Sequence, residues 1–107
     1  MQHLRGYGAL DAEAMTAPFS DTARVVTPDR VYAGKAEVLV FMKDLVEEFS
    51  VPEISNETHG MTVDGNVVML MWSAESPKAV YTFGVDTYLV EDGEIVLLTT
   101  AAQVEPK

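Results

Sequence analysis

The sequence contains no cysteine. Without thiols the chain cannot build a disulfide framework, a thiolate metal site or a cysteine nucleophile. Histidine is almost as scarce, since His3 and His59 are the only two. Glu53, Glu57 and His59 share strand spacing, but one histidine with two carboxylates is more typical of a solvated strand face than of a metal site. We therefore expect no metal and no cofactor.

Positive charge and long apolar runs are also lacking. Seven Lys and Arg residues face 17 Asp and Glu residues, which gives a formal net charge of -10. Such a surface repels phosphate backbones and anionic lipids, so we expect no nucleic-acid partner and no membrane partner. No apolar run approaches the ~20 residues of a membrane-spanning helix, and residues 1–7 hold no signal-peptide core. We expect a cytoplasmic protein.

What is present is the composition of a folded domain. Hydrophobic residues make up 48% of the chain and charged residues 22%, a balance typical of globular proteins rather than of disordered chains. At 107 residues the length predicts a single domain that covers residues 1–107.

The N-terminal part mixes helix with short strands. We expect helix over residues 1–17, in two pieces. The second piece, residues 12–15, begins after Asp11 because that carboxylate can accept the free N–H groups of a first helical turn. Two short strands are expected next, at residues 23–27 and 30–32.

The clearest helix spans residues 35–48. Its apolar residues recur at helical spacing and predict one buried face. They are Val38, Leu39, Phe41, Met42, Leu45, Val46 and Phe49.

The second half of the sequence predicts an antiparallel meander. Four strands are expected, at residues 53–63, 67–75, 80–90 and 94–102. Asp64-Gly65 and Asp92-Gly93 predict tight hairpin turns, because glycine tolerates the positive φ that such turns require. We expect the tail, residues 103–107, to be frayed. Helices followed by a meander indicate an α+β domain with its helices on one side of a curved sheet.

Both faces of this sheet are expected to be covered. A sheet with one solvated face alternates apolar and polar residues, and residues 67–72 do not alternate, nor do residues 95–98. The helices can cover one face only. We therefore predict a homodimer that packs through the open sheet face.

Several stretches resemble SnoaL-like and ketosteroid isomerase-like domains of the nuclear transport factor 2-like superfamily. The starts of these domains are similar to F-S-D-T-A-R-V-V-T-P (Phe19–Pro28) and V-Y-A-G-K-A-E-V (Val31–Val38). Their last hairpin resembles D-T-Y-L-V-E-D-G-E-I-V (Asp86–Val96) followed by T-T-A-A (Thr99–Ala102). The resemblance implies a cone-shaped roll, in which a curved antiparallel sheet carries helices on its concave side.

The resemblance also implies positions for a site. Ketosteroid isomerase uses a carboxylate base together with a tyrosine and a protonated aspartate. Asp86 matches the place of the protonated aspartate, and Tyr7 is the nearest candidate for the tyrosine. The family base directly precedes the proline of the first strand, where this chain has Thr27 before Pro28. Threonine does not take up a proton at neutral pH, so the family's own route to isomerisation lacks its base here.

Three residues are candidates for chemistry on their own account. Asp86 lies in mid-strand, and in an apolar pocket its pKa would rise, so that it could serve as a general acid, a general base or an oxyanion donor. The alternative is a solvated or simply hydrogen-bonded carboxylate. His59 forms an acid/base pair with Asp86 if the sheet brings them together, and is otherwise a surface residue. Asp29 replaces the missing base if its turn bends inward, and is otherwise a turn residue.

Aromatic residues suit an apolar pocket. The expected pocket residues are Tyr7, Tyr32, Trp72 and Tyr88. The sequence thus predicts a small dimeric domain that binds a hydrophobic small molecule. If catalytic, it performs a proton transfer such as isomerisation, cyclisation or dehydration with Asp86. The alternative is a non-catalytic ligand-binding or protein-interaction module, which the threonine at the base position favours.

Overall fold

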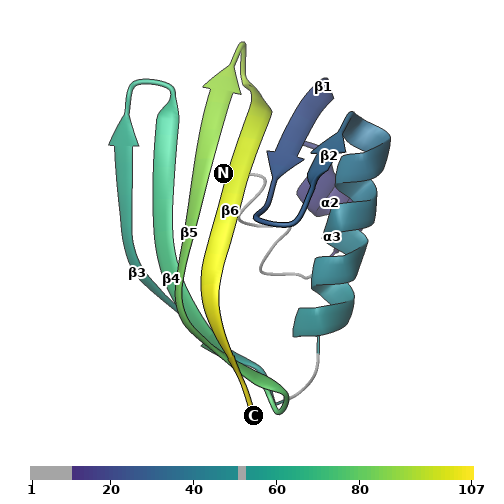
Figure 1. Cartoon of the computed structure of the whole chain (residues 1–107). Coiled ribbons are helices and arrows are strands. Elements are labelled where there is room, and N and C mark those ends of the chain that lie inside the picture. Colours follow the sequence, from purple (N-terminus) through teal and green to yellow (C-terminus); the bar gives the residue numbers. More distant parts are fainter. Residues whose placement is uncertain (1–10, 51–52) are drawn as a thin grey trace.

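A computed structural model describes residues 11–50 and 53–107. In this part of the chain, two helices lie against one six-stranded sheet (Figure 1). The helices are α2 (Ala12–Thr16) and α3 (Lys35–Phe49). The strands are β1 (Phe19–Val26), β2 (Val31–Ala33), β3 (Ser55–Asp64), β4 (Val67–Glu75), β5 (Ala79–Glu91) and β6 (Glu94–Pro106). The α+β class is confirmed. Neither described helix is long and apolar enough to cross a membrane.

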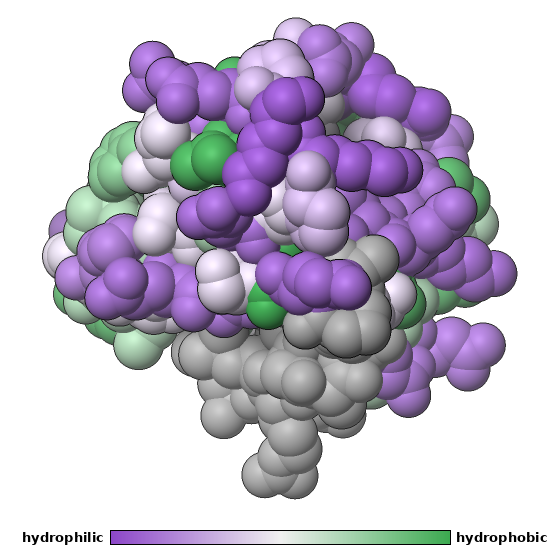
Figure 2. All heavy atoms as spheres, turned by 90° about the horizontal axis from the view of Figure 1, so that it is seen from below, coloured by the Kyte–Doolittle hydropathy of each residue, from purple (hydrophilic) through white to green (hydrophobic). Residues whose placement is uncertain are grey.

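The strand order across the sheet is β2-β1-β6-β5-β4-β3. Neighbouring strands are antiparallel except β1 and β6, which run parallel. The sheet bends around α3, which lies on its concave face, and its two edges do not meet (Figure 1). This arrangement confirms the expected curved sheet with helices on its concave side. The end that carries the C terminus is mostly hydrophilic (Figure 2), as the net charge of -10 leads one to expect.

Local chemistry explains where these elements begin and turn. Oδ1 of Asp11 accepts the backbone N–H groups of Glu13 at 3.0 Å and Ala14 at 3.2 Å, which caps α2 as expected. The β5–β6 hairpin turns through Asp92 and Gly93, both at positive φ (51° and 78°), as a two-residue turn of the primed kind requires.

Several predicted boundaries differ from the structure by one or more residues, and strand pairing explains two of the differences. The β3–β4 turn lies one residue later than predicted, at residues 65–66, because Asp64 pairs with Val67. Strand β1 begins at Phe19, earlier than the expected residue 23, because Phe19 pairs with Ile95 and both side chains are buried in the core.

The predicted frayed tail is wrong. Strand β6 continues to Pro106, with Val104 opposite Tyr81 and Pro106 opposite Ala79. Lys107 then places its Nζ 2.6 Å from Oε2 of Glu75. The tail is ordered because β5 begins as early as Ala79 and offers a partner to each residue that follows the predicted end of β6.

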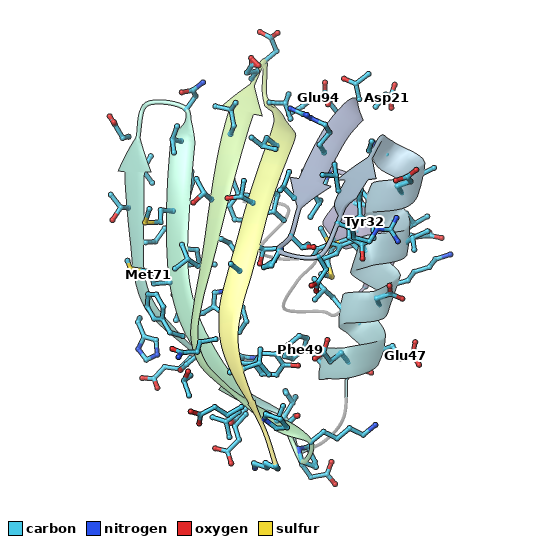
Figure 3. The ribbon with its side chains drawn as sticks, in the orientation of Figure 1. Asp21, Tyr32, Glu47, Phe49, Met71 and Glu94 are labelled. Carbon is cyan, nitrogen blue, oxygen red and sulfur yellow. The ribbon has the colours of Figure 1, made fainter. Side chains whose placement is uncertain are left out.

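The strand register decides which side chains meet α3. On β5 the buried residues Gly84, Asp86 and Tyr88 alternate and face the concave side. Opposite them, β4 places Trp72 against Gly84. The intervening residues face the convex side, as Figure 3 shows for Met71, which lies on the side of the sheet away from the helix. The concave face therefore carries the core and one carboxylate.

Candidate functional site

A small hollow lies between α3 and the concave face of the sheet. Its lining is apolar except at two positions. The lining residues are Phe41, Met42, Leu45, Phe49, Trp72, Asp86, Leu98 and Thr100. The volume of the hollow is about 320 Å³ when the open space at its mouth is included. Its enclosed part is much smaller: the centre of a water molecule can occupy about 30 Å³, which is enough for about two waters. Phe49 points from the last turn of α3 toward the sheet, whereas Glu47 points away from it (Figure 3).

Asp86 is the one titratable residue among the lining residues. Its side chain reaches the hollow because it shares the concave face of β5 with Gly84 and Tyr88. Only 4% of its surface is exposed, an uncommon state for an aspartate.

Two side chains donate hydrogen bonds to this carboxyl group, one from each neighbouring strand. Thr100 on β6 lies directly opposite Asp86, and its Oγ1 is 2.6 Å from Oδ1. Trp72 on β4 lies diagonally across, and its Nε1 is 3.2 Å from the same Oδ1. Both donors thus meet Oδ1, while Oδ2 has no hydrogen-bond donor within the described ranges.

Burial raises the pKa of Asp86 above its ordinary value, because removal from water penalises the carboxylate form. The hydrogen bonds from Thr100 and Trp72 act in the opposite direction and lower the pKa, since they stabilise the charged form. Desolvation is the largest of the three effects. Asp86 therefore keeps its proton to a higher pH than a solvated aspartate does.

The other two candidates for chemistry lie elsewhere. His59 is exposed on β3 and its Nε2 lies 2.6 Å from Oγ of Ser73, and β4 separates it from Asp86 on β5. The structure does not form the His59–Asp86 pair. Asp29 is exposed in the β1–β2 turn, where its backbone N–H donates to Oγ1 of Thr27 at 3.2 Å. The turn holds Asp29 outside the set of lining residues, so it does not take the place of a base beside Asp86.

Thr27 itself has a structural role. Its Oγ1 accepts the backbone N–H groups of Asp29 and Arg30, and donates to the carbonyl oxygen of Arg30 at 3.1 Å. The hydroxyl closes the turn between β1 and β2, as threonine and serine hydroxyls do in many turns.

Of the four residues expected to form the pocket, Trp72 lines the hollow. Tyr88 is buried in the core with 5% of its surface exposed. Tyr32 packs its ring 5.1 Å from that of Phe41, and the guanidinium carbon of Arg30 lies 4.0 Å from its ring centroid. Tyr7 lies outside the described residues.

The sequence reasoning missed Thr100 as a partner of Asp86. Extending the pairing of the Asp92-Gly93 turn along the hairpin would place Thr99 opposite Asp86. A register shift between Leu89 and Val90 places Thr100 there instead. The sequence identified the lining residues of α3 only as members of an apolar helix face.

Within the described ranges, no group of three or more His, Cys, Asp or Glu side chains could hold a metal ion.

Solved structures share this fold over nearly the whole chain. A nuclear transport factor 2-like protein of unknown function from Cytophaga hutchinsonii matches with a TM-score of 0.77 and 17% identity, over 94% of this chain and 92% of that one. A polyketide cyclase candidate from Sinorhizobium meliloti matches with a TM-score of 0.76 and 18% identity (92% and 89%). A ketosteroid isomerase candidate from Kribbella flavida matches with a TM-score of 0.76 and 16% identity (95% and 73%).

No curated protein sequence matches the chain. The family model of the SnoaL-like domain, by contrast, matches residues 2–98, which is most of the sequence. The chain is therefore a member of the SnoaL-like domain family.

Proposed function

We propose that this domain binds a small, uncharged, largely apolar molecule in the hollow beneath α3, and that Asp86 exchanges a proton or a hydrogen bond with one oxygen of that molecule. The observation that carries the proposal is the buried Asp86 carboxyl group, the one titratable group among described lining residues that are apolar except for Asp86 and Thr100. An apolar hollow with a few convergent polar groups and a shifted pKa is typical of a ligand site.

The expected ligand is uncharged because the described lining residues offer no compensating charge. A buried ion without a partner is strongly unfavourable. An anion would also meet Asp86 and a chain of net charge -10. The enclosed part of the hollow has room for about two waters, and the rest of its 320 Å³ is open space at the mouth, so only a small ligand fits.

Asp86 can act through its free oxygen in either protonation state. With Oδ1 occupied by Trp72 and Thr100, the proton of the neutral form resides on Oδ2 and can be donated to a ligand carbonyl. The ionised form can instead take a proton from a ligand atom and return it to another. One carboxyl group that does both carries out an isomerisation with no net change in protonation.

Two proteins of similar fold are named after enzymes that act on small molecules. The Sinorhizobium meliloti and Kribbella flavida proteins carry the names of a polyketide cyclase and a ketosteroid isomerase. Fold similarity at this level of identity does not carry an activity, so the ligand assignment rests on the residues of this chain.

The second candidate is a non-catalytic ligand-binding domain, and a specific observation favours it. Thr27 stands at the family's base position and its hydroxyl is engaged in the β1–β2 turn, while the described lining offers no second acid or base beside Asp86. In this alternative the hollow binds the same class of molecule and Asp86 only orients it.

The single tryptophan of the chain provides the test, because Trp72 lines the hollow. We expect its fluorescence to change in a saturable way with small cyclic ketones and not with carboxylates of matched shape. Asp86→Leu should weaken ketone binding, and Asp86→Asn should keep part of it because the amide can still donate. If Asp86→Leu binds all of the ketones as well as the wild type does, the role of Asp86 is wrong.

A measurement of turnover distinguishes the proton-transfer enzyme from the non-catalytic ligand-binding domain. If the domain is an enzyme, proton exchange at carbon adjacent to the ketone, followed by NMR in deuterated water, should be accelerated by the wild type and not by Asp86→Asn. Binding without accelerated exchange assigns the non-catalytic role.

We also propose that the domain is a homodimer through its convex sheet face. That face carries exposed large apolar side chains on adjacent strands, with Val67 38%, Met69 40% and Phe83 47% exposed. Adjacent apolar side chains on one exposed face are typical of an interaction site. A second copy would cover them without leaving an unpaired surface on either partner.

A further inference from the structure

Trp72 lies flat against Gly84 on the concave face. The two residues are directly opposite each other in the β4–β5 ladder. A Cβ atom on Gly84 would lie within 2.6 Å of three indole carbons, Cδ2, Cε2 and Cζ2. Real Cβ atoms do not approach other heavy atoms so closely, so the indole can occupy this place only because residue 84 has no side chain.

We infer that Gly84 is a positioning residue of the Asp86 site: its missing side chain lets the Trp72 indole lie across β5 and bring Nε1 to Oδ1 of Asp86. The significance for a ligand rests on the proposed function above. The positioning itself is a property of the free protein and can be tested without any ligand.

Sheet geometry explains why glycine is needed at this position. Asp86 is two residues beyond Gly84 on the same face of β5, which makes it the diagonal neighbour of Trp72. A long aromatic side chain can reach a diagonal neighbour only by passing over the residue directly opposite its own. Any residue larger than glycine at position 84 would lift the indole off β5 and draw Nε1 away from the carboxyl group.

A turn or a strained backbone does not explain this glycine. Gly84 lies within β5 and does not have the positive φ of Gly34, Gly65 and Gly93. Glycine inside a strand is destabilising, so its presence calls for a close approach by another group. The indole supplies that close approach.

The consequence for the site is an oriented carboxyl group. Thr100 donates to Oδ1 from the β6 side and Trp72 donates to it from the β4 side. With both donors on one oxygen, Oδ2 is the atom left to face the hollow. Gly84 thus acts through Trp72 to determine which oxygen a bound molecule meets.

The matched pair of variants is Gly84→Ala and Gly60→Ala. Gly60 is also a strand glycine without positive φ, but the nearest atom to an added Cβ is the flexible Cε of Met71, at 3.1 Å. We expect Gly84→Ala to shift the Trp72 emission maximum. It should also move the Asp86 titration midpoint, followed by the ¹³C shift of its carboxyl carbon, to higher pH, because a hydrogen bond that favours the carboxylate is lost. Gly60→Ala should change neither.

Trp72→Phe provides a second measurement of the same relationship. It removes the indole N–H and should raise the Asp86 midpoint by itself. If Gly84 acts through Trp72, adding Gly84→Ala to Trp72→Phe should give little further rise. A Gly84→Ala protein that keeps the wild-type emission and the wild-type midpoint overturns the inference, as does a midpoint shift that simply adds to that of Trp72→Phe.

Should Gly84→Ala prevent folding, a smaller side chain at position 72 keeps the inference testable. In a Trp72→Leu background the added methyl group no longer meets an indole. Gly84→Ala should then leave the urea midpoint, followed by circular dichroism, unchanged or raised. An equally large loss of stability in both backgrounds overturns the inference. Because every one of these readouts is taken on the free protein, absence of ligand binding would overturn the proposed function and leave this result standing.

Discussion

The hydroxyl of Thr100 donates a 2.6 Å hydrogen bond to Oδ1 of Asp86 across the β5–β6 pair. Its effect on the carboxyl group opposes that of burial, since it stabilises the carboxylate while desolvation favours the neutral acid. The charge state of the hollow therefore depends on a balance between a hydroxyl group on one strand and the apolar packing of α3 on the other side.

The first prediction concerns this balance. Thr100→Val keeps the shape of the side chain and removes its donor, so the pKa of Asp86 should rise further. The ¹³C shift of the Asp86 carboxyl carbon, recorded against pH, measures it. Thr99→Val is the matched control, because Thr99 pairs with Thr87 and faces the convex side. An unchanged midpoint in Thr100→Val would show that this bond does not stabilise the carboxylate.

The second prediction concerns stability and pH. The folded-state pKa of Asp86 is raised above the ordinary aspartate value of 3.8, so the contribution of Asp86 to stability is fully present below that value. This stabilisation is lost as the pH rises through the folded-state pKa. The loss is about 1.4 kcal/mol for each unit by which the folded-state pKa exceeds the unfolded-state pKa. Asp86→Asn does not titrate. Its stability relative to the wild type should therefore increase with pH across this window and then level off.

Urea unfolding at a series of pH values, followed by Trp72 fluorescence, provides the measurement. The difference between the two proteins isolates Asp86 from the many other carboxylates of the chain. Asp29→Asn is the control, since it makes the same substitution at an exposed position. A flat difference for Asp86→Asn would mean that the buried carboxyl group titrates like a solvated one.

Much of the fold could be predicted because the sequence patterns that indicate it involve residues close together along the chain. Asp11 caps α2, the apolar face of residues 35–48 forms the buried side of α3, and Asp92-Gly93 turns the last hairpin. The tail beyond residue 102 could not be judged in the same way. Its order comes from pairing with β5, a contact between distant residues that no local pattern records.

The residues of the candidate site also differ in whether a local sequence pattern could reveal them. Asp86 could be singled out as a carboxylate within an apolar strand, and Trp72 as an aromatic residue on the neighbouring strand. Thr100 could not, because a one-residue shift in the β5–β6 ladder moved it into the place that the turn alone would give to Thr99. The roles considered for His59 and Asp29 depended on distances across the sheet that spacing along the chain does not fix.

The third prediction concerns the proposed dimer. Met69 is 40% exposed on the convex face and Met61 is 51% exposed on the concave side of edge strand β3. A lysine on the convex face would place an unpaired charge between two copies. Sedimentation velocity should therefore find a dimer for the wild type and for Met61→Lys, and a monomer for Met69→Lys. A monomeric wild type, or a Met69→Lys protein as dimeric as Met61→Lys, would contradict the proposed interface.

The last prediction concerns the end of β6. Deleting residues 103–107 removes the ladder partners of Ala79, Val80, Tyr81 and Phe83. Each backbone hydrogen bond contributes about 0.5–1.5 kcal/mol, so the free energy of unfolding should fall by about 2–4 kcal/mol. Lys107→Met is the matched control, because its ion pair with Glu75 is largely exposed and such pairs contribute about 1 kcal/mol or less. Both values can be read from urea unfolding followed by Trp72 fluorescence. If the deletion costs no more than Lys107→Met does, the ladder beyond Ala102 contributes nothing to stability. The start of β5 must then be held by its pairing with β4 and by the Ser76 turn, whose Oγ accepts the N–H groups of Lys78 and Ala79.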